Sequence, residues 1–104
     1  MPSPGQRRAA YEAAVRGLRA EADRLLAQGQ SEEFVAREMV RRRNELKREA
    51  RRQDDPEIVR LMERRNLEKY GDPIGPPAER LYLKYGNWLA VIEAACRPAR
   101  LSNS

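Results

Sequence analysis

Two arginine–asparagine pairs, Arg43-Asn44 and Arg65-Asn66, carry the most distinctive chemistry in this sequence. Each lies in a segment with helical periodicity, where asparagine is unfavourable because its amide competes for backbone hydrogen bonds. A guanidinium offers a planar fork of donors to phosphate or carboxylate, and an amide adds a donor and an acceptor. The two pairs could therefore converge on one anionic group. Alternatively, they bind each other, helix ends or a glycine-proline loop in a buried polar network. Both interpretations predict partly buried side chains.

A repeated pattern extends these two pairs. Arg42-Arg43-Asn44 is followed by Lys47, and Arg64-Arg65-Asn66 is followed by Lys69 at the same spacing. Lys69 therefore joins Arg43, Asn44, Arg65 and Asn66 as a candidate residue for binding an anion.

Polar and aromatic side chains follow the second copy of the pattern. Tyr70 and Asp72 are the candidate catalytic residues, because they are the nearest groups able to take part in proton transfer. A desolvated Asp72 could act as a general base, but an aspartate in a turn is more typical of a cap, and we favour the cap. Tyr70, Tyr82, Tyr85 and Trp88 could stack on bases, although their helical spacing is more typical of a core.

The positive charge of the chain is concentrated in one segment. Residues 37–52 contain eight basic and three acidic residues, and this difference equals the net charge of +5 of the whole protein. Four arginines are predicted to lie along one side of a helix, opposite its apolar side: Arg37, Arg41, Arg48 and Arg52. Such a face favours nucleic acid, an acidic protein or an anionic membrane surface as partner. The alternative is a solvated helix face with no binding role.

The composition excludes several classes of chemistry. The chain has no histidine, which excludes Ser-His-Asp and Cys-His catalysis and histidine-ligated metals. The single cysteine, Cys96, excludes an intramolecular disulfide and a cysteine-cluster zinc site. The acidic residues lack metal-binding spacing, and no glycine-rich phosphate loop is present. We therefore expect no metal and no cofactor. No apolar run approaches the roughly 20 residues that cross a bilayer, and no signal sequence is evident, so we expect a cytoplasmic protein.

The periodicity predicts a single all-α domain over residues 1–104, with flexible ends at 1–5 and 99–104. A first long helix follows Pro4-Gly5 and ends before Gly29, and a second runs from the cap Ser31 to about Gln53. Three shorter helices follow: one from Asp55-Pro56 to Tyr70, one from Ala78 to Tyr85, and one from the cap Asn87 to Pro98. We expect the two long helices to be antiparallel, with the shorter ones folded over them.

Apolar stripes at steps of three and four residues predict the core. The stripes are Tyr11, Val15, Leu18, Ala22 and Leu25; Val35, Met39, Leu46 and Ala50; Ile58, Leu61 and Met62; Ala78, Leu81, Tyr82 and Tyr85; and Trp88, Val91, Ile92, Ala95 and Cys96. The sequence Lys-Tyr-Gly-Asx occurs twice, at residues 69–72 and 84–87. We interpret both copies as structural punctuation, with glycine in a left-handed turn and the Asx residue as a cap.

Several of these motifs together resemble a known family. They are Arg43-Asn44-Glu45-Leu46-Lys47; Arg65-Asn66 with Lys69-Tyr70-Gly71-Asp72-Pro73-Ile74-Gly75-Pro76; and Gly86-Asn87-Trp88 with Val91-Ile92-Glu93 and Arg97-Pro98. In this combination the chain resembles a C-terminal toxin domain of bacterial polymorphic toxins of the Rhs and contact-dependent inhibition type. The resemblance implies delivery into the cytoplasm of a competing cell, action there on nucleic acids or nucleotides, and neutralisation by an immunity protein.

Three hypotheses follow for the function. In the first, the domain is a toxin that acts on RNA or a nucleotide, which it binds through Arg43, Asn44, Arg65, Asn66 and Lys69, with Tyr70 and Asp72 as the nearest polar chemistry. In the second, it is a non-catalytic module that binds nucleic acid or an acidic protein through the arginine face of the second helix. In the third, it forms a homodimer through an exposed apolar stripe on the first helix.

Overall fold

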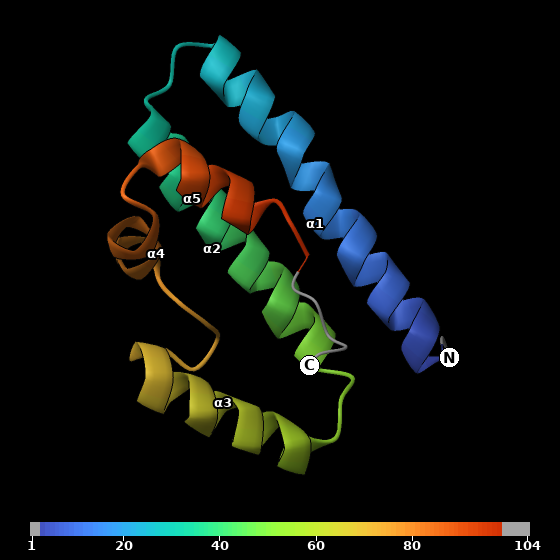
Figure 1. Cartoon of the computed structure of the whole chain (residues 1–104). Coiled ribbons are helices and arrows are strands. Elements are labelled where there is room, and N and C mark those ends of the chain that lie inside the picture. The colour runs from blue at the N-terminus through green and yellow to red at the C-terminus, as the bar shows by residue number, and fades with distance from the viewer. Residues whose placement is uncertain (1–2, 99–104) are drawn as a thin grey trace.

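The computed structural model describes residues 3–98, which form an all-α domain (Figure 1). The helices are α1 (Pro4–Ala27), α2 (Glu32–Arg51), α3 (Pro56–Tyr70), α4 (Ala78–Tyr85) and α5 (Trp88–Ala95). The long helices α1 and α2 run in opposite directions, and α5 lies against both of them with α4 beside it. The predicted fold class, with two long antiparallel helices and three shorter ones, is confirmed. Within residues 3–98, no helix is long and apolar enough to cross a membrane.

Helix α1 begins within the segment that we expected to be a flexible end. The Ser3 hydroxyl accepts a hydrogen bond from the Gln6 backbone N–H at 3.2 Å, and the Gln6 side chain accepts one from the Ser3 N–H at 2.8 Å. This reciprocal capping box, with Pro4 in the first turn, satisfies backbone donors that would otherwise be exposed. The expectation for residues 3–5 is therefore corrected. The remaining expected ends, residues 1–2 and 99–104, lie outside the described residues.

The predicted starts of α2, α3 and α5 are confirmed by their caps, whereas α2 and α5 end at Arg51 and Ala95, before the predicted Gln53 and Pro98. Ser31 caps α2 through a bond from the Phe34 N–H at 3.1 Å, and Asp55 caps α3 through a bond from the Glu57 N–H at 2.9 Å. Asn87 caps α5 by accepting from the Ala90 N–H at 2.8 Å. Because these caps are local interactions between neighbouring residues, the sequence predicts them well.

The core lies where α1, α2 and α5 meet. Its largest fully buried side chains are Met39, Val15, Val35 and Val91. Most of the predicted stripes of α1 and α5 are buried: Val15, Leu18, Ala22, Leu25, Val91, Ile92, Ala95 and Cys96. The stripe on α1 is thus covered within the domain, which removes the surface that our dimer hypothesis required. Tyr11 and Trp88 are half-buried, and Tyr82 and Tyr85 are more exposed than we expected.

Helix α3 does not fold over the long helices as we expected. None of its residues is buried, and Ile58, Leu61 and Leu67 are all more than half exposed. Figure 1 shows α3 crossing near the C-terminal end of α2 and apart from α1. The side chains that α2 contributes to the space beside α3 are Lys47, Ala50 and Arg51, of which the two long ones are charged. An apolar face gains little by packing against charged groups, so α3 keeps its distance.

Candidate functional site

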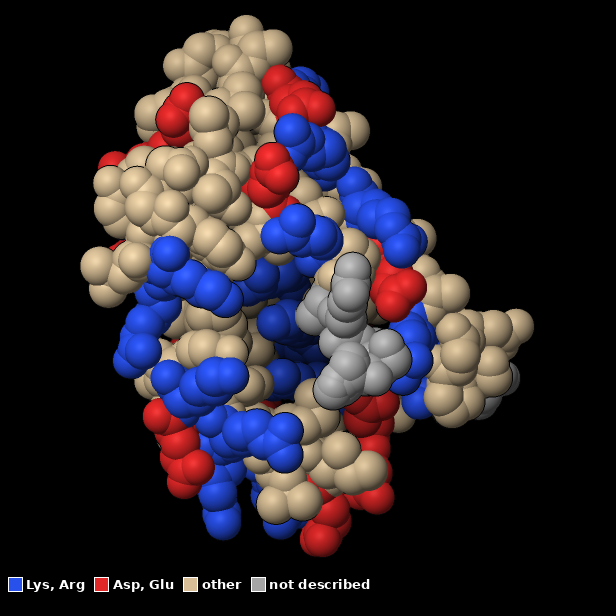
Figure 2. All heavy atoms as spheres, viewed as in Figure 1, with Lys and Arg blue, Asp and Glu red and all other residues tan. Residues whose placement is uncertain are grey.

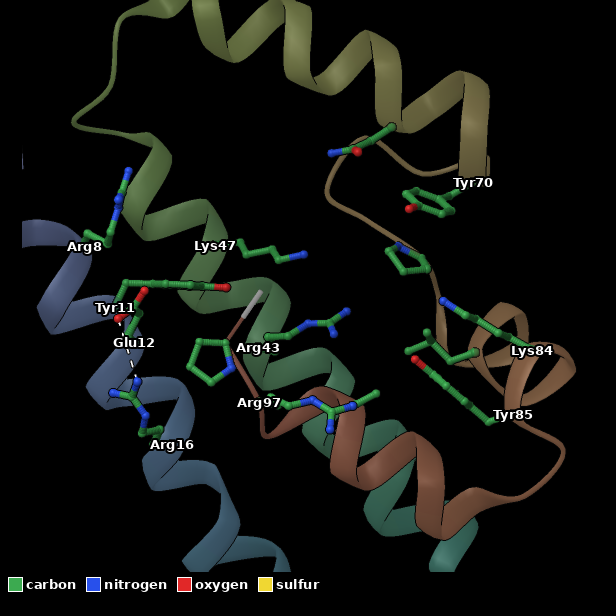
Figure 3. A pocket seen from close by; sticks show the side chains of 15 residues that line it. Arg8, Tyr11, Glu12, Arg16, Arg43, Lys47, Tyr70, Lys84, Tyr85 and Arg97 are labelled. Carbon is green, nitrogen blue, oxygen red and sulfur yellow. Dashed lines mark ion pairs between the residues drawn. The ribbon is translucent and has the colours of Figure 1, made fainter. Parts of the chain in front are cut away.

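A cationic pocket of about 960 Å³ opens between α1, α2, the end of α3, α4 and the end of α5. In Figure 2 basic side chains line the hollow at the centre of the molecule, and Figure 3 shows the pocket from close by. Among the described residues that line it are six basic side chains and one acidic one. They are Arg8, Arg16, Arg43, Lys47, Lys84 and Arg97 against Glu12. A hollow with this charge excess concentrates anions.

The deepest cations come from one side of α2. Ala36, Val40, Arg43, Lys47 and Arg51 follow each other at steps of three and four residues, so they share a helix face. The first two are buried in the core, whereas Arg43 and Lys47 project into the pocket (Figure 3). Arg43 was among our candidate residues for binding an anion, whereas Lys47 was not, and the arginine face of our second hypothesis lies elsewhere on the helix. The signal in the sequence is an apolar stripe that continues as a row of cations.

Arg43 is a buried cation, and no ion pair joins it to another residue of the described range 3–98. Its side chain is 7% exposed, and its Nε and Nη2 atoms find no hydrogen-bond partner within residues 3–98. Burial lowers the pKa of the guanidinium from its ordinary value, and the nearby Tyr11, Tyr85 and Cys96 only partly oppose this effect. Buried guanidinium groups are normally paired, because an unpaired charge in low dielectric is costly.

Lys47 lies one helical turn further along the same face. Burial, followed by the positive charges of Arg43 and Arg51, lowers the pKa of Lys47 to about 8, and the carboxylate of Asp72 acts in the opposite direction. A Cβ atom at Gly75 would lie 3.0 Å from the Lys47 Nζ. Because glycine has no side chain, the Lys47 ammonium fits beside residue 75 without a steric clash. Two neighbouring cations are thus held in the pocket at a cost to the fold.

Three tyrosines also line the pocket: Tyr11 from α1, Tyr70 from α3 and Tyr85 from α4. The Lys69 ammonium lies 5.3 Å from the Tyr70 ring centroid, and the Lys84 ammonium lies 5.3 Å from that of Tyr85. These two lysine–tyrosine pairs belong to the Lys-Tyr-Gly-Asx repeat. Each glycine ends its helix with a positive φ, 74° at residue 71 and 83° at residue 86, which confirms the repeat as structural punctuation. In addition, both copies place a tyrosine at the pocket.

The glycine-proline loop forms one wall, and it is anchored by polar side chains. Asn66 Nδ2 donates to the carbonyl oxygens of Pro73 at 3.0 Å and Ile74 at 3.4 Å, and the Arg51 guanidinium donates to the same two oxygens. Asp72 Oδ1 accepts from the Ile74 N–H at 2.8 Å and the Gly75 N–H at 3.4 Å. The capping role of Asp72 is confirmed, because its Oδ1 atom accepts both of these backbone hydrogen bonds in the turn.

The two arginine–asparagine pairs meet only in part. Arg43, Asn66 and Tyr70 line the same pocket, and Asn66 binds the glycine-proline loop, as the polar-network interpretation expected. Asn44 is half-buried, but it lines neither this pocket nor the smaller one that adjoins it. The Asn44 Oδ1 atom is buried and has no hydrogen-bond partner among the described residues.

The last two candidates, Arg65 and Lys69, are exposed. We expected the arginine–asparagine pairs to be partly buried, and this expectation is wrong for Arg65. Arg65 lines an adjoining pocket of about 470 Å³, which shares Arg8, Tyr11, Lys47 and Asn66 with the main one. Lys69 lies over the Tyr70 ring.

The outer arginine face of α2 is largely paired with carboxylates. Arg37 binds Glu33 and Glu79, Arg41 binds Glu38 and Glu45, and Arg52 lies 3.6 Å from Glu49. Hydrogen bonds from Arg41 are the main reason that the pKa of Glu38 is lowered to about 2. Arg48 is exposed, and no ion pair joins it to the part of the chain that the structure describes. Most of the charge on this face is therefore compensated.

No metal-binding cluster is found among the described residues, 3–98. No protein-family model, no curated protein and no solved structure matches the chain.

Proposed function

We propose that this domain binds RNA or a nucleotide in the cationic pocket, and that it acts on this substrate as the polymorphic-toxin domains that it resembles do. The observation that carries the proposal is the Arg43 guanidinium, which is buried and has two nitrogen atoms without a partner in the described residues. An anionic ligand would supply that partner. Phosphate oxygens suit a planar guanidinium, because they can accept two parallel hydrogen bonds.

The tyrosines favour a nucleotide over a simple inorganic anion. Three of the four tyrosines in the chain line the pocket, and Lys84 lies over the ring of one of them, Tyr85. A tyrosine ring can stack on a base, and this contact is insensitive to base sequence. Phosphate contacts supply affinity and stacking supplies selection for nucleic acid, so the two sets of groups together fit a nucleotide.

The chemistry available in the pocket is electrostatic. With no histidine in the chain, a reaction at a phosphodiester would depend on positioning the 2′-hydroxyl and on stabilising the charged transition state. Arg43 and Lys47 supply positive charge to the pocket in which such a reaction would take place. Tyr70 lines the pocket and remains a candidate catalytic residue, whereas the Asp72 carboxylate already accepts two backbone hydrogen bonds.

The pocket is a better candidate than the outer face of α2, which was our alternative site for nucleic acid or an acidic partner. On that face Arg37, Arg41 and Arg52 each pair with a glutamate, and exposed pairs of this kind bring little free charge to a ligand. In the pocket, by contrast, Arg43 and Lys47 have no ion-pair partner among residues 3–98.

Fluorescence anisotropy with a labelled single-stranded RNA and a labelled nucleotide tests the binding. We expect Arg43→Met to weaken binding at least about tenfold, because hydrogen bonds to a charged group are lost. The matched control is Arg48→Met, which removes an exposed arginine from the same helix and should change affinity less than about twofold. Equal binding by the wild type and Arg43→Met would contradict the proposal.

Induced expression in a bacterium tests the toxin activity separately. We expect the wild type to arrest growth and to alter the total RNA or nucleotide pool, and Arg43→Met to allow normal growth at the same protein level. Normal growth with intact RNA and nucleotides under the wild type would remove the toxin part of the proposal and leave the binding to be judged by anisotropy.

A further inference from the structure

We propose that Arg43 and Lys47 form a subsite for a terminal phosphate, so that the ligand is a phosphate monoester such as a mononucleotide or the phosphorylated end of an RNA. This inference rests on the proposed function and specifies its substrate class. A phosphodiester within a continuous strand is the alternative that it excludes from this subsite.

The first argument is charge balance. Arg43 and Lys47 lie one helical turn apart and bring two positive charges to the pocket, and no described residue forms an ion pair with either. Glu12 also lines the pocket, but it lies 3.8 Å from the Arg16 guanidinium. A phosphate monoester carries close to two negative charges at neutral pH, whereas a diester carries one. The monoester therefore matches the combined charge of Arg43 and Lys47.

The second argument is depth. Arg43 is 7% exposed, and its Nε and Nη2 atoms are both buried. The buried core residue Leu81 and the half-buried Ala94 line the same pocket. A phosphate within a strand carries a sugar on each side, and these two substituents restrict its approach to a buried guanidinium. A terminal phosphate carries one substituent and can reach the guanidinium with its free oxygens.

The third argument is the rigidity of the wall beside Lys47. Gly75 is buried, and a Cβ atom there would lie 3.0 Å from the Lys47 Nζ. The loop that carries Gly75 is held by Asn66, Arg51 and Asp72. The wall beside the Lys47 ammonium is therefore held in place before any ligand arrives. A preorganised pair of donors loses little entropy on binding.

A set of matched oligonucleotides tests the inference. The probes are one short RNA with 2′-O-methyl riboses, so that no 2′-hydroxyl is available for cleavage, carrying a 5′-phosphate, a 3′-phosphate or a hydroxyl at both ends. We expect at least one phosphorylated probe to bind about tenfold or more tightly than the hydroxyl probe. The tighter of the two phosphorylated probes identifies the end that enters the subsite.

The variants assign the effect to the two residues. Arg43→Met and Lys47→Met should each remove the preference for the phosphorylated probe, and Arg48→Met should keep it. Circular dichroism confirms that each variant is folded. If Arg43→Met fails to fold, two other measurements test the subsite. One is the probe preference of Lys47→Met, and the other is a titration of the wild type with inorganic phosphate, in which we expect a saturable change of the ³¹P chemical shift.

The outcomes separate this inference from the proposed function. Three probes of equal affinity would overturn the terminal-phosphate subsite and leave RNA binding standing. A phosphate preference that persists in both methionine variants would also overturn the subsite, because the phosphate would then bind elsewhere. No binding of any probe or of a mononucleotide would contradict the proposed function itself.

Discussion

Replacing Lys47 with methionine should make the folded protein more stable while it weakens phosphate binding. Methionine keeps a long unbranched side chain but removes a charge that the fold holds at a cost. The cost has two sources, the burial of the ammonium and its repulsion by Arg43 and Arg51. Residues kept at the expense of stability are typical of binding sites, so the substitution tests whether Lys47 serves a ligand.

The pKa sets the magnitude. The pKa of Lys47 falls from its ordinary value of 10.5 to about 8, and a pKa difference of one corresponds to about 1.4 kcal/mol. The full difference is therefore about 3 kcal/mol, and solvent screening of the partly exposed side chain reduces it. We expect Lys47→Met to raise the free energy of unfolding by about 1–3 kcal/mol at neutral pH. For a domain of this size, this equals a rise in Tm of several degrees.

The pH dependence gives the sharper signature. Between about pH 8 and 10.5 the unfolded chain retains the Lys47 proton that the folded protein has released. The contribution of Lys47 therefore makes the wild type more stable as pH rises through this window. Methionine cannot titrate, so the advantage of the variant should be full below about pH 8 and should disappear near pH 10.5.

Urea denaturation of both proteins over this pH range measures the difference, and the comparison cancels the groups that they share. A variant that is less stable than the wild type at neutral pH would refute the reasoning. A difference in stability that does not change with pH would refute it as well.

Further predictions concern the loop, the outer face, the core and the ligand. Asp72→Ala should lower the free energy of unfolding in urea by about 1–2 kcal/mol, because the Ile74 and Gly75 N–H groups lose their acceptor; unchanged stability would contradict this role. Arg41→Gln should change RNA affinity less than about twofold by anisotropy, since Arg41 is paired with Glu38 and Glu45. A tenfold loss of affinity would indicate that RNA binds to the outer arginine face of α2 and not in the pocket. Met39→Ala should cost about 2–5 kcal/mol in urea denaturation, since Met39 is fully buried. Phosphate affinity should fall as pH rises above about 8, because Lys47 then loses its charge, and ³¹P titrations at several pH values would show a flat profile if Lys47 does not bind.

The boundaries of the helices could be predicted from the sequence because they depend on neighbours along the chain. Ser31 and Asn87 cap the helices that they precede, and Gly71 and Gly86 end the helices that they follow. The place of α3 could not be predicted in the same way. Its apolar residues suggested a packed face, but packing depends on which side chains the neighbouring helix presents.

The site was predicted in part, and the error has a specific cause. We assigned α2 a single buried side through Val35 and Met39, which put Arg43 and Lys47 between the two faces. Ala36 and Val40 are buried as well. The buried side of α2 is therefore wider than the pattern suggested, and its edge continues into the two pocket cations. Arg43 was already a candidate, and the sequence from Ala36 onward, apolar residues followed by cations on one face, would have added Lys47 to it.

The Nε–H resonance of Arg43 gives the most direct test of the central claim, that this buried guanidinium binds a phosphate-bearing ligand. Nitrogen-15 NMR of the side-chain Nε–H groups during a titration with adenosine 5′-monophosphate reads this atom alone. We expect a saturable downfield shift at Arg43 and none at the exposed Arg48, with adenosine, which lacks the phosphate, producing no such shift. A ligand that perturbs other arginines while the Arg43 Nε–H stays unchanged would contradict the account.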